Sequence, residues 1–215
     1  MKLSVLKLSA CLLLLGSAAA HSQTLNWGSE TESAIMDSEG TGLGAPELGE
    51  TFLFELGAFT QGFIPDETNM AQWLDNWHVF DSTTLFTNED GSAQFSSTRT
   101  IQDYDATAQP GSEYQSMFEG LKGYIWVRNT ENTEYFLASA DTWTFQQKDP
   151  NCCSNTPPVT WSITDVDTPV WGGSGYISPE NPYIQTQAVP ELSSAFLAFL
   201  ATGMFALRRR RPQGN

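Results

Sequence analysis

The sequence predicts an all-β fold, a single antiparallel β-sandwich of jelly-roll-like topology that carries one short helix. In short runs such as 142–145 and 159–164, apolar residues alternate with Ser and Thr, so each run would have one buried face. Clusters of Gly, Pro, Asn and Asp separate such runs, as turns do in an antiparallel sheet. Only one stretch has the spacing of apolar residues that a helix requires. The sequence has no repeat at a fixed period, so a solenoid is not expected.

The predicted strands follow from local patterns. Residues 51–60 form a phenylalanine-rich run interrupted by Gly57, and 93–101 is rich in Ser and Thr, as a half-exposed strand would be. Two apolar runs flank residues 129–132, which predicts a hairpin with a loop of the four-residue type. The full prediction places strands at 51–60, 93–101, 124–127, 135–137, 142–145, 159–164 and 183–186, and extended structure at 78–80.

A short helix is predicted from residue 67 to residue 77. Its large apolar residues recur at i, i+3, i+4 and i+7, so they would share one face of a helix. They are Met70, Trp73, Leu74 and Trp77. Asp66 stands just before this stretch and is the expected N-cap. We expect the helix to lie over an open end of the sheet.

The first twenty residues have the layout of a secretory signal peptide. Lys2 and Lys7 form a positive start, and 8–15 is an apolar core that is too short for a retained anchor. Small residues at 18–20 predict cleavage before His21. The predicted domains are a signal peptide at 1–20, a β-sandwich at 21–170, a Gly/Pro-rich spacer at 171–188 and a C-terminal tail at 189–211.

The tail predicts a transmembrane helix. Residues 192–207 are mostly apolar on all sides, and as a helix they would span roughly 24 Å of a hydrocarbon core of about 30 Å. Long basic side chains and local thinning of the bilayer can absorb that mismatch. The stop-transfer cluster is Arg208, Arg209, Arg210 and Arg211, which predicts that this end is cytoplasmic.

The order of features in the tail resembles a known sorting signal. Val189, Pro190 and Glu191 precede the apolar stretch, and the arginine cluster follows it. This order is similar to the PEP-CTERM signal of exported bacterial proteins. The family motif usually has a second proline where this chain has Leu192. The resemblance implies that the protein is the substrate of an exosortase-type transpeptidase, which would cut near Glu191 after the precursor reaches the inner membrane.

The predicted mature segment is strongly acidic. Twenty-four of the 25 acidic residues but only four of the ten basic ones fall within 23–188, so this segment carries a formal charge of −20. Such a surface repels nucleic acid, which is therefore not an expected partner. The segment has two cysteines, Cys152 and Cys153, whose Cα atoms lie ~3.8 Å apart, below the ~4.4 Å at which ordinary disulfides begin. A strained vicinal bridge and an intermolecular bridge both remain open.

No pattern in the sequence indicates catalysis. His78 is the sole internal histidine, and it stands beside Trp77, where a packed or rim residue is the usual reading. Neither a nucleophile elbow nor a phosphate-binding glycine loop occurs. Chance pairs among the many carboxylates keep a hydrolase open as a third reading. We expect no cofactor. Residues 88–91 and 165–167 are similar to calcium turns, but neither completes a twelve-residue loop.

The sequence therefore favours a non-enzymatic protein of the cell surface or extracellular matrix, delivered through its tail. Its expected partners are an exosortase-type enzyme, the inner membrane before processing, and exopolysaccharide. A carbohydrate-binding β-sandwich at the cell surface is the alternative, because exposed tryptophans can stack on sugar rings. Most tryptophans occupy core-facing positions, and Trp171 in its glycine-rich loop is our candidate saccharide contact.

Overall fold

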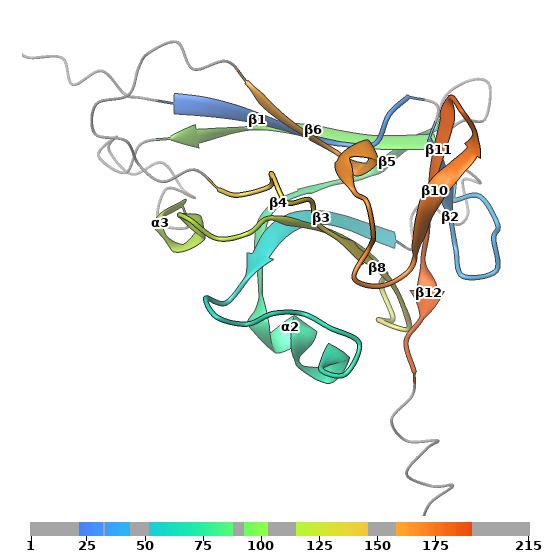
Figure 1. The fold of residues 1–215 in the computed structure, drawn as a ribbon, viewed down its shortest axis with the longest axis horizontal. Helices are drawn as coiled ribbons and strands as arrows, with labels where there is room; N and C mark the ends of the chain where they lie inside the picture. Colours follow the sequence, from blue (N-terminus) through green and yellow to red (C-terminus); the bar gives the residue numbers. More distant parts are fainter. Residues whose placement is uncertain are drawn as a thin grey trace, which may run out of the picture.

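The computed structural model describes residues 22–31, 33–43, 52–87, 93–102, 115–145 and 158–190. These residues form an all-β fold with a few short helical turns, which confirms the predicted all-β class (Figure 1). The predicted signal peptide, the segment 191–211 and the cysteine pair lie outside the described residues. Among the residues that the structure describes, no helix has the length and apolar character that a membrane crossing requires.

The largest sheet has five antiparallel strands in the order β12-β8-β7-β3-β4. A four-residue turn joins β7 to β8, as the sequence predicted, and its Asn132 adopts a positive φ of 58°. The strands are β3 (Phe52–Phe59), β4 (Trp77–Thr83), β7 (Tyr124–Asn129), β8 (Glu134–Ala138) and β12 (Gln187–Ala188).

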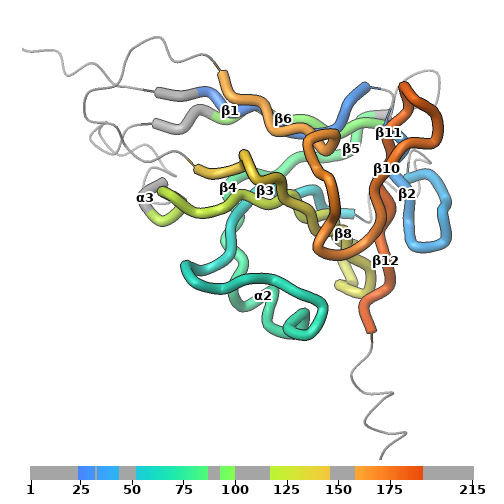
Figure 2. Tube along the Cα trace, in the orientation of Figure 1, coloured from blue at the N-terminus to red at the C-terminus, as the bar shows by residue number. Residues whose placement is uncertain are grey.

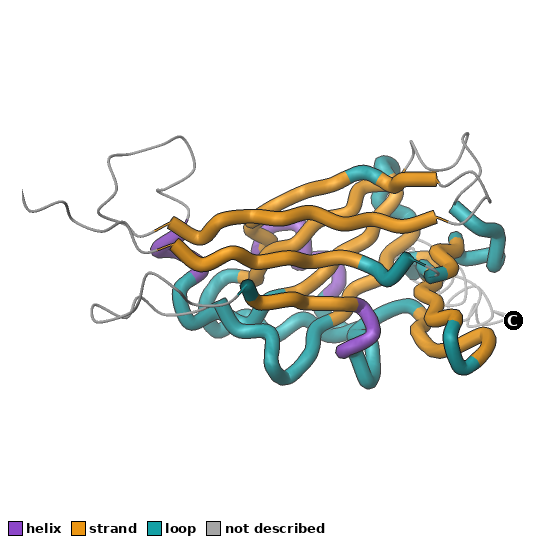
Figure 3. Tube along the Cα trace, turned by 90° about the horizontal axis from the view of Figure 1, so that it is seen from above, coloured by secondary structure: helices purple, strands orange, loops and turns teal. Residues whose placement is uncertain are grey.

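Two smaller sheets complete the fold, and each contains one parallel pair. The four-stranded sheet, in the order β5-β6-β1-β9, lies at the top of the molecule in Figure 1 and therefore faces the viewer in Figure 3, which is seen from above. The three-stranded sheet, β10-β11-β2, brings the late hairpin beside an early strand (Figure 2). The parallel pairs are β1 with β9 and β11 with β2, so the predicted purely antiparallel arrangement is wrong at these two places. The strands are β1 (Ser22–Gly28), β2 (Ala34–Met36), β5 (Leu85–Thr87), β6 (Ala93–Gln102), β9 (Val159–Ser162), β10 (Gly173–Ser178) and β11 (Asn181–Gln185).

The helical segments are short. The predicted helix is present but begins later, as η1 (Met70–Gln72) followed by α2 (Trp73–Asn76). Asp66 is not its N-cap, because its carboxylate instead accepts bonds from the hydroxyl and amide of Thr68. Both bonds lower the pKa of Asp66, and the bond from the Thr68 hydroxyl has the larger effect. The other helical segments are α3 (Gln115–Phe118) and η3 (Ile163–Asp165).

Two apolar cores lie on opposite faces of the five-stranded sheet. Alternate residues of a strand face opposite sides, and β3 accordingly sends Phe54 and Leu56 into one core and Phe59 into the other. The first core fills the space between the five- and four-stranded sheets, where the rings of Phe54 and Phe95 lie 4.8 Å apart. The second core lies under α2 and contains Phe59, Met70, Trp73, Tyr124, Trp126, Tyr135 and Leu137.

Gly57 allows β3 and β4 to approach closely. A Cβ atom at this position would lie 2.2 Å from the carbonyl oxygen of His78 and 2.7 Å from the ring of Trp77. The pairing of the two strands shifts register between Leu56 and Gly57. The extra residue of this bulge is Phe80 of β4. Gly57 lies opposite the bulge within a continuous β3, where a larger residue would not fit.

The described strands agree with most of the predicted ones but not with all. Strands β3, β6, β7, β8, β9 and β11 lie where the sequence placed them. Residues 142–145 do not form a strand and make one isolated bridge, between Thr144 and Lys122. The alternation was still informative about burial, because Trp143 and Phe145 are buried whereas Thr142 and Thr144 are exposed.

The predicted spacer at 171–188 is wrong, because this segment is part of the fold. It supplies β10, β11 and β12 to two different sheets. Gly172 serves close packing instead of extension: a Cβ at this position, where φ is 91°, would lie 2.6 Å from the carbonyl oxygen of Gln185. Ile184 is buried in the first core. The folded part of the chain therefore continues to Val189, well beyond the predicted boundary at residue 170.

Candidate functional site

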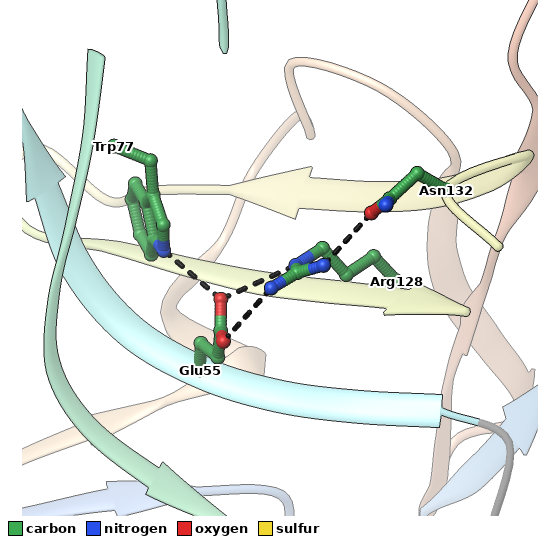
Figure 4. Close-up of polar contacts among 4 residues, drawn as sticks. All are labelled: Glu55, Trp77, Arg128 and Asn132. Atoms are coloured by element: carbon green, nitrogen blue, oxygen red, sulfur yellow. Dashed lines mark hydrogen bonds and ion pairs between the residues drawn. The ribbon is translucent and has the colours of Figure 1, made fainter. Parts of the chain in front are cut away.

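The most enclosed polar cluster lies on the second-core face of the five-stranded sheet, between β3, β4 and β7 (Figure 4). The Arg128 guanidinium approaches the Glu55 carboxylate with two nitrogens, at 3.1 Å for Nη2–Oε1 and 3.3 Å for Nε–Oε2. Trp77 donates its indole N–H to Oε2 of Glu55 at 3.0 Å. Arg128 also donates from Nη1 to Oδ1 of Asn132, at 2.8 Å, in the β7–β8 turn.

Local sequence explains how this cluster forms. Glu55 alternates with Phe54 and Leu56, so it faces away from the first core. Arg128 follows the apolar residues of β7 and lies opposite Leu53 of β3, two pairs along the ladder from the Glu55–Trp126 pair. A long side chain reaches such a diagonal neighbour. The guanidinium carbon lies 5.6 Å from the ring centre of Trp126, at cation–π distance.

The cluster is a structural cross-link. The side chains of Glu55 and Arg128 are 9% and 16% exposed, so both charges are largely removed from water. Each carboxylate oxygen of Glu55 already accepts at least one bond, which leaves little free to act on a substrate. The arrangement ties two neighbouring strands and a turn to β3, as a buried and well-bonded ion pair can do.

A second buried carboxylate, Asp81, links the two large sheets. Its Oδ2 accepts the indole N–H of Trp27 at 2.9 Å, and its Oδ1 lies 3.3 Å from Nε of Arg99. Asp81 is 7% exposed, and it comes from β4, whereas Trp27 and Arg99 come from β1 and β6. Both buried carboxylates are thus held by one arginine and one tryptophan.

His78 lies on β4, where its Nε2 is 3.0 Å from the hydroxyl oxygen of Thr60. The residue is half-buried. This contact agrees with the packed or rim position that the sequence suggested. A hydroxyl partner at that nitrogen does not supply the carboxylate that orients a catalytic histidine in the familiar triads.

Trp171 is not presented freely to solvent. Its backbone exchanges hydrogen bonds with Leu137, and its indole N–H donates to the carbonyl oxygen of Gln187 at 3.1 Å. The half-buried ring packs against the second core. The saccharide contact at Trp171 stays a prediction, although its polar atom is already used within the fold.

Of the two segments that are similar to calcium turns, the structure describes only 165–167. Oδ2 of Asp165 accepts the backbone N–H of Ser162 and the indole N–H of Trp143, at 3.0 Å and 3.2 Å, as part of the η3 capping box. Residues 88–91 lie outside the described residues. Within the described ranges, no group of three or more His, Cys, Asp or Glu side chains is placed to hold a metal.

The first two of the predicted sorting residues lie at the end of the described chain. Val189 donates its backbone N–H to the carbonyl oxygen of Thr133 at 2.7 Å, and its side chain packs against the second core. Pro190 is exposed. Glu191, Leu192 and the arginine cluster at 208–211 lie outside the described residues.

The second core is unusually rich in tyrosine and tryptophan. Burial raises the pKa of Tyr124 and of Tyr135, and the nearby Arg128 opposes part of the rise at Tyr135. The indole N–H of Trp126 is fully buried and has no hydrogen-bond partner among the described residues. Trp126 makes edge contacts with Trp73, Trp77 and Tyr135. The cluster acts as a packed aromatic layer beneath α2.

Sequence reasoning missed Glu55, Arg128 and Asp81 as key polar residues. A signal for the first pair was available, because 23–188 contains four basic residues and one of them ends a strongly apolar strand. A lone acid within another apolar strand, such as Glu55, is the natural partner for such a buried cation.

These features define an all-β protein whose buried carboxylates are hydrogen-bonded to other side chains within the fold. Comparisons with protein-family models, with curated proteins and with solved structures find no match.

Proposed function

We propose that this is a non-enzymatic exported protein of the cell surface or extracellular matrix. Its two stacked sheets would constitute a jelly-roll-like β-sandwich, preceded by a cleaved signal peptide. An exosortase-type transpeptidase would act on the tail at Val189, Pro190 and Glu191, after the apolar helix has anchored the precursor in the inner membrane. The four arginines would hold that helix in place until cleavage.

The observation that carries the proposal is the position of the last sheet pairing. Strand β12 ends at Ala188, and Val189 makes the final backbone bond of the described chain, to Thr133 (Figure 1). Proteolysis is favoured where backbone is exposed and free of such bonds. A cut at Glu191 would fall after β12 and after the bond of Val189. Both cores and all three sheets would then stay with the released product.

The two buried carboxylates, Glu55 and Asp81, do not supply the catalytic pair that a secreted hydrolase would need. A glycoside hydrolase needs two carboxyl groups that face a substrate across a cleft. Glu55 and Asp81 are each bonded to an arginine and a tryptophan. A carbohydrate-binding module remains the second candidate, because a groove elsewhere on the surface has suitable chemistry, as argued below.

Exchange of the motif glutamate tests the sorting step. We expect Glu191→Ala to be exported and to lose its first twenty residues, but to accumulate in the inner membrane because the transpeptidase no longer cuts it. Cell fractionation with immunoblotting would measure the distribution. Glu131→Ala is the matched control, since Glu131 is an exposed glutamate on the β7–β8 turn, and it should reach the surface normally. Normal surface delivery of Glu191→Ala would refute the proposal.

A further inference from the structure

A shallow groove of about 340 Å³ lies beside the tip of the β10–β11 hairpin. It falls at the lower end of the roughly 300–1,000 Å³ typical of small-molecule sites. The turn after β1, the η3 segment and the hairpin border it, and the hairpin is the orange pair of strands in Figures 1 and 2. Its lining residues are Glu30, Thr31, Thr164, Tyr176, Glu180 and Pro182.

Hydrogen bonds within the protein use the hydroxyl donors on one side of this groove, so oxygen acceptors remain available there. Ser162 donates its hydroxyl to Oε1 of Glu30 at 2.8 Å, because a carboxylate can only accept. The hydroxyl of Thr164 must then donate to Oγ of Ser162, at 2.9 Å. The hydroxyl hydrogen of Thr164 is thus directed inward, and its oxygen and the Glu30 carboxylate have lone pairs left for a ligand. Glu180 adds a second carboxylate.

An exposed aromatic ring stands beside these acceptors. Tyr176 is 59% exposed and Ile177, its neighbour, is 63% exposed. Successive residues of a regular strand point to opposite faces, but the β10–β11 pairing shifts register between Tyr176 and Ser178. Such irregularities often redirect a side chain next to a binding site. The hairpin therefore presents an apolar surface next to a row of oxygen acceptors.

The chemistry of the lining selects a ligand class. An anion would meet two carboxylates on a surface of net negative charge, and nucleic acid is disfavoured for the same reason. Calcium takes six to eight oxygen ligands, and no cluster of three or more metal-binding side chains occurs within the described ranges. Sugars fit better, because their hydroxyl groups donate hydrogen bonds and their C–H faces stack on aromatic rings.

We propose that this groove binds a neutral polysaccharide chain. The ring of Tyr176 stacks on one sugar unit, and the oxygens of Glu30, Thr164 and Glu180 accept bonds from its hydroxyl groups. The site is separate from Trp171, which the sequence suggested. It does not depend on how the tail is processed, because all six lining residues belong to the folded part of the chain.

Affinity electrophoresis of the purified protein tests this site. Separate gels would contain dextran, laminarin, hydroxyethylcellulose or galactomannan, and we expect at least one of them to retard the protein. Tyr176→Ala should weaken that binding about tenfold, as loss of a central aromatic contact commonly does, and Glu180→Gln should weaken it by a smaller factor. Phe86→Ala is the matched control, because Phe86 is an aromatic residue of similar exposure, 51%, on β5.

The binding of a neutral chain should persist at high ionic strength and in the presence of EDTA. Retardation that disappears in salt, with binding to polylysine instead, would show that the groove takes a basic partner and would overturn the proposal. Dependence on calcium, full binding by Tyr176→Ala, or no retardation in any of the four gels would overturn it as well. None of these outcomes bears on the sorting of the tail, so the two proposals fail separately.

Discussion

At the scale of single residues, two arginine–carboxylate pairs organise the polar interior. Arg128 and Arg99 each contact a carboxylate that is less than a tenth exposed. Burying a charge is costly unless a partner and hydrogen bonds compensate it. The Glu55 pair meets that condition most fully, because tryptophan and asparagine side chains complete the network.

Removal of Arg128 should therefore destabilise the fold strongly. Arg128→Met leaves Glu55 as an uncompensated buried charge, and we expect the free energy of unfolding to fall by about 3–5 kcal/mol. Urea unfolding at pH 7 measures this change. Lys122→Met is the control, because the Lys122–Asp141 pair lies on the surface and should contribute nothing measurable.

A second variant separates the charge from the packing. The double variant Glu55→Leu with Arg128→Met removes both charges together, and it should recover much of the lost stability because no unpaired charge remains buried. Equal stability of Arg128→Met and the wild-type protein would contradict the assignment of a buried ion pair.

At the scale of elements, the contact between β3 and β4 depends on a glycine. Gly57→Ala would place a Cβ atom against the His78 carbonyl and the Trp77 ring, which the strands can relieve only by separating. We expect a loss of about 1–3 kcal/mol, the usual range for an overpacked site. Gly42→Ala is the control for thermal unfolding, since a Cβ there meets nothing within 4 Å. Equal melting temperatures for the two variants would contradict the packing of this bulge.

The individual strands differ in how well the sequence predicts them. Strands with a clear two-residue period or a local turn, such as β3, β7 and β8, were predictable because short-range patterns encode them. Strand β1 was not, since Leu25 and Trp27 are its only large apolar residues and its partner β6 lies about seventy residues away. The Gly/Ser composition of β10 similarly conceals a strand that pairs with β11.

The candidate sites were less predictable than the strands, for a physical reason. Glu55 and Arg128 are 73 positions apart, and only the register of β3 against β7 brings them together. The groove likewise joins Glu30 to Tyr176, which are distant in sequence. The sequence singled out Trp171 by its glycine-rich surroundings, but the adjacent Gly172 serves close packing against Gln185 of β11.

At the scale of the whole molecule, the strongest feature is the acidic charge, which is compatible with the function outside the cell that we propose. Three of the four basic residues in 23–188 are paired with carboxylates, so most of the acidic excess remains uncompensated. Self-repulsion of this kind favours solubility and disfavours anionic partners. The predicted sorting residues begin directly after β12, the last strand of the described residues, so the proposed cut would fall beyond that strand.

The intact mass of the protein recovered from the cell surface tests the central claim most directly. The account predicts a chain that begins at His21 and ends near Pro190 or Glu191, without the apolar segment and the four arginines. A full-length chain in the cytosol, with both Lys2 and Arg211 present, would contradict it.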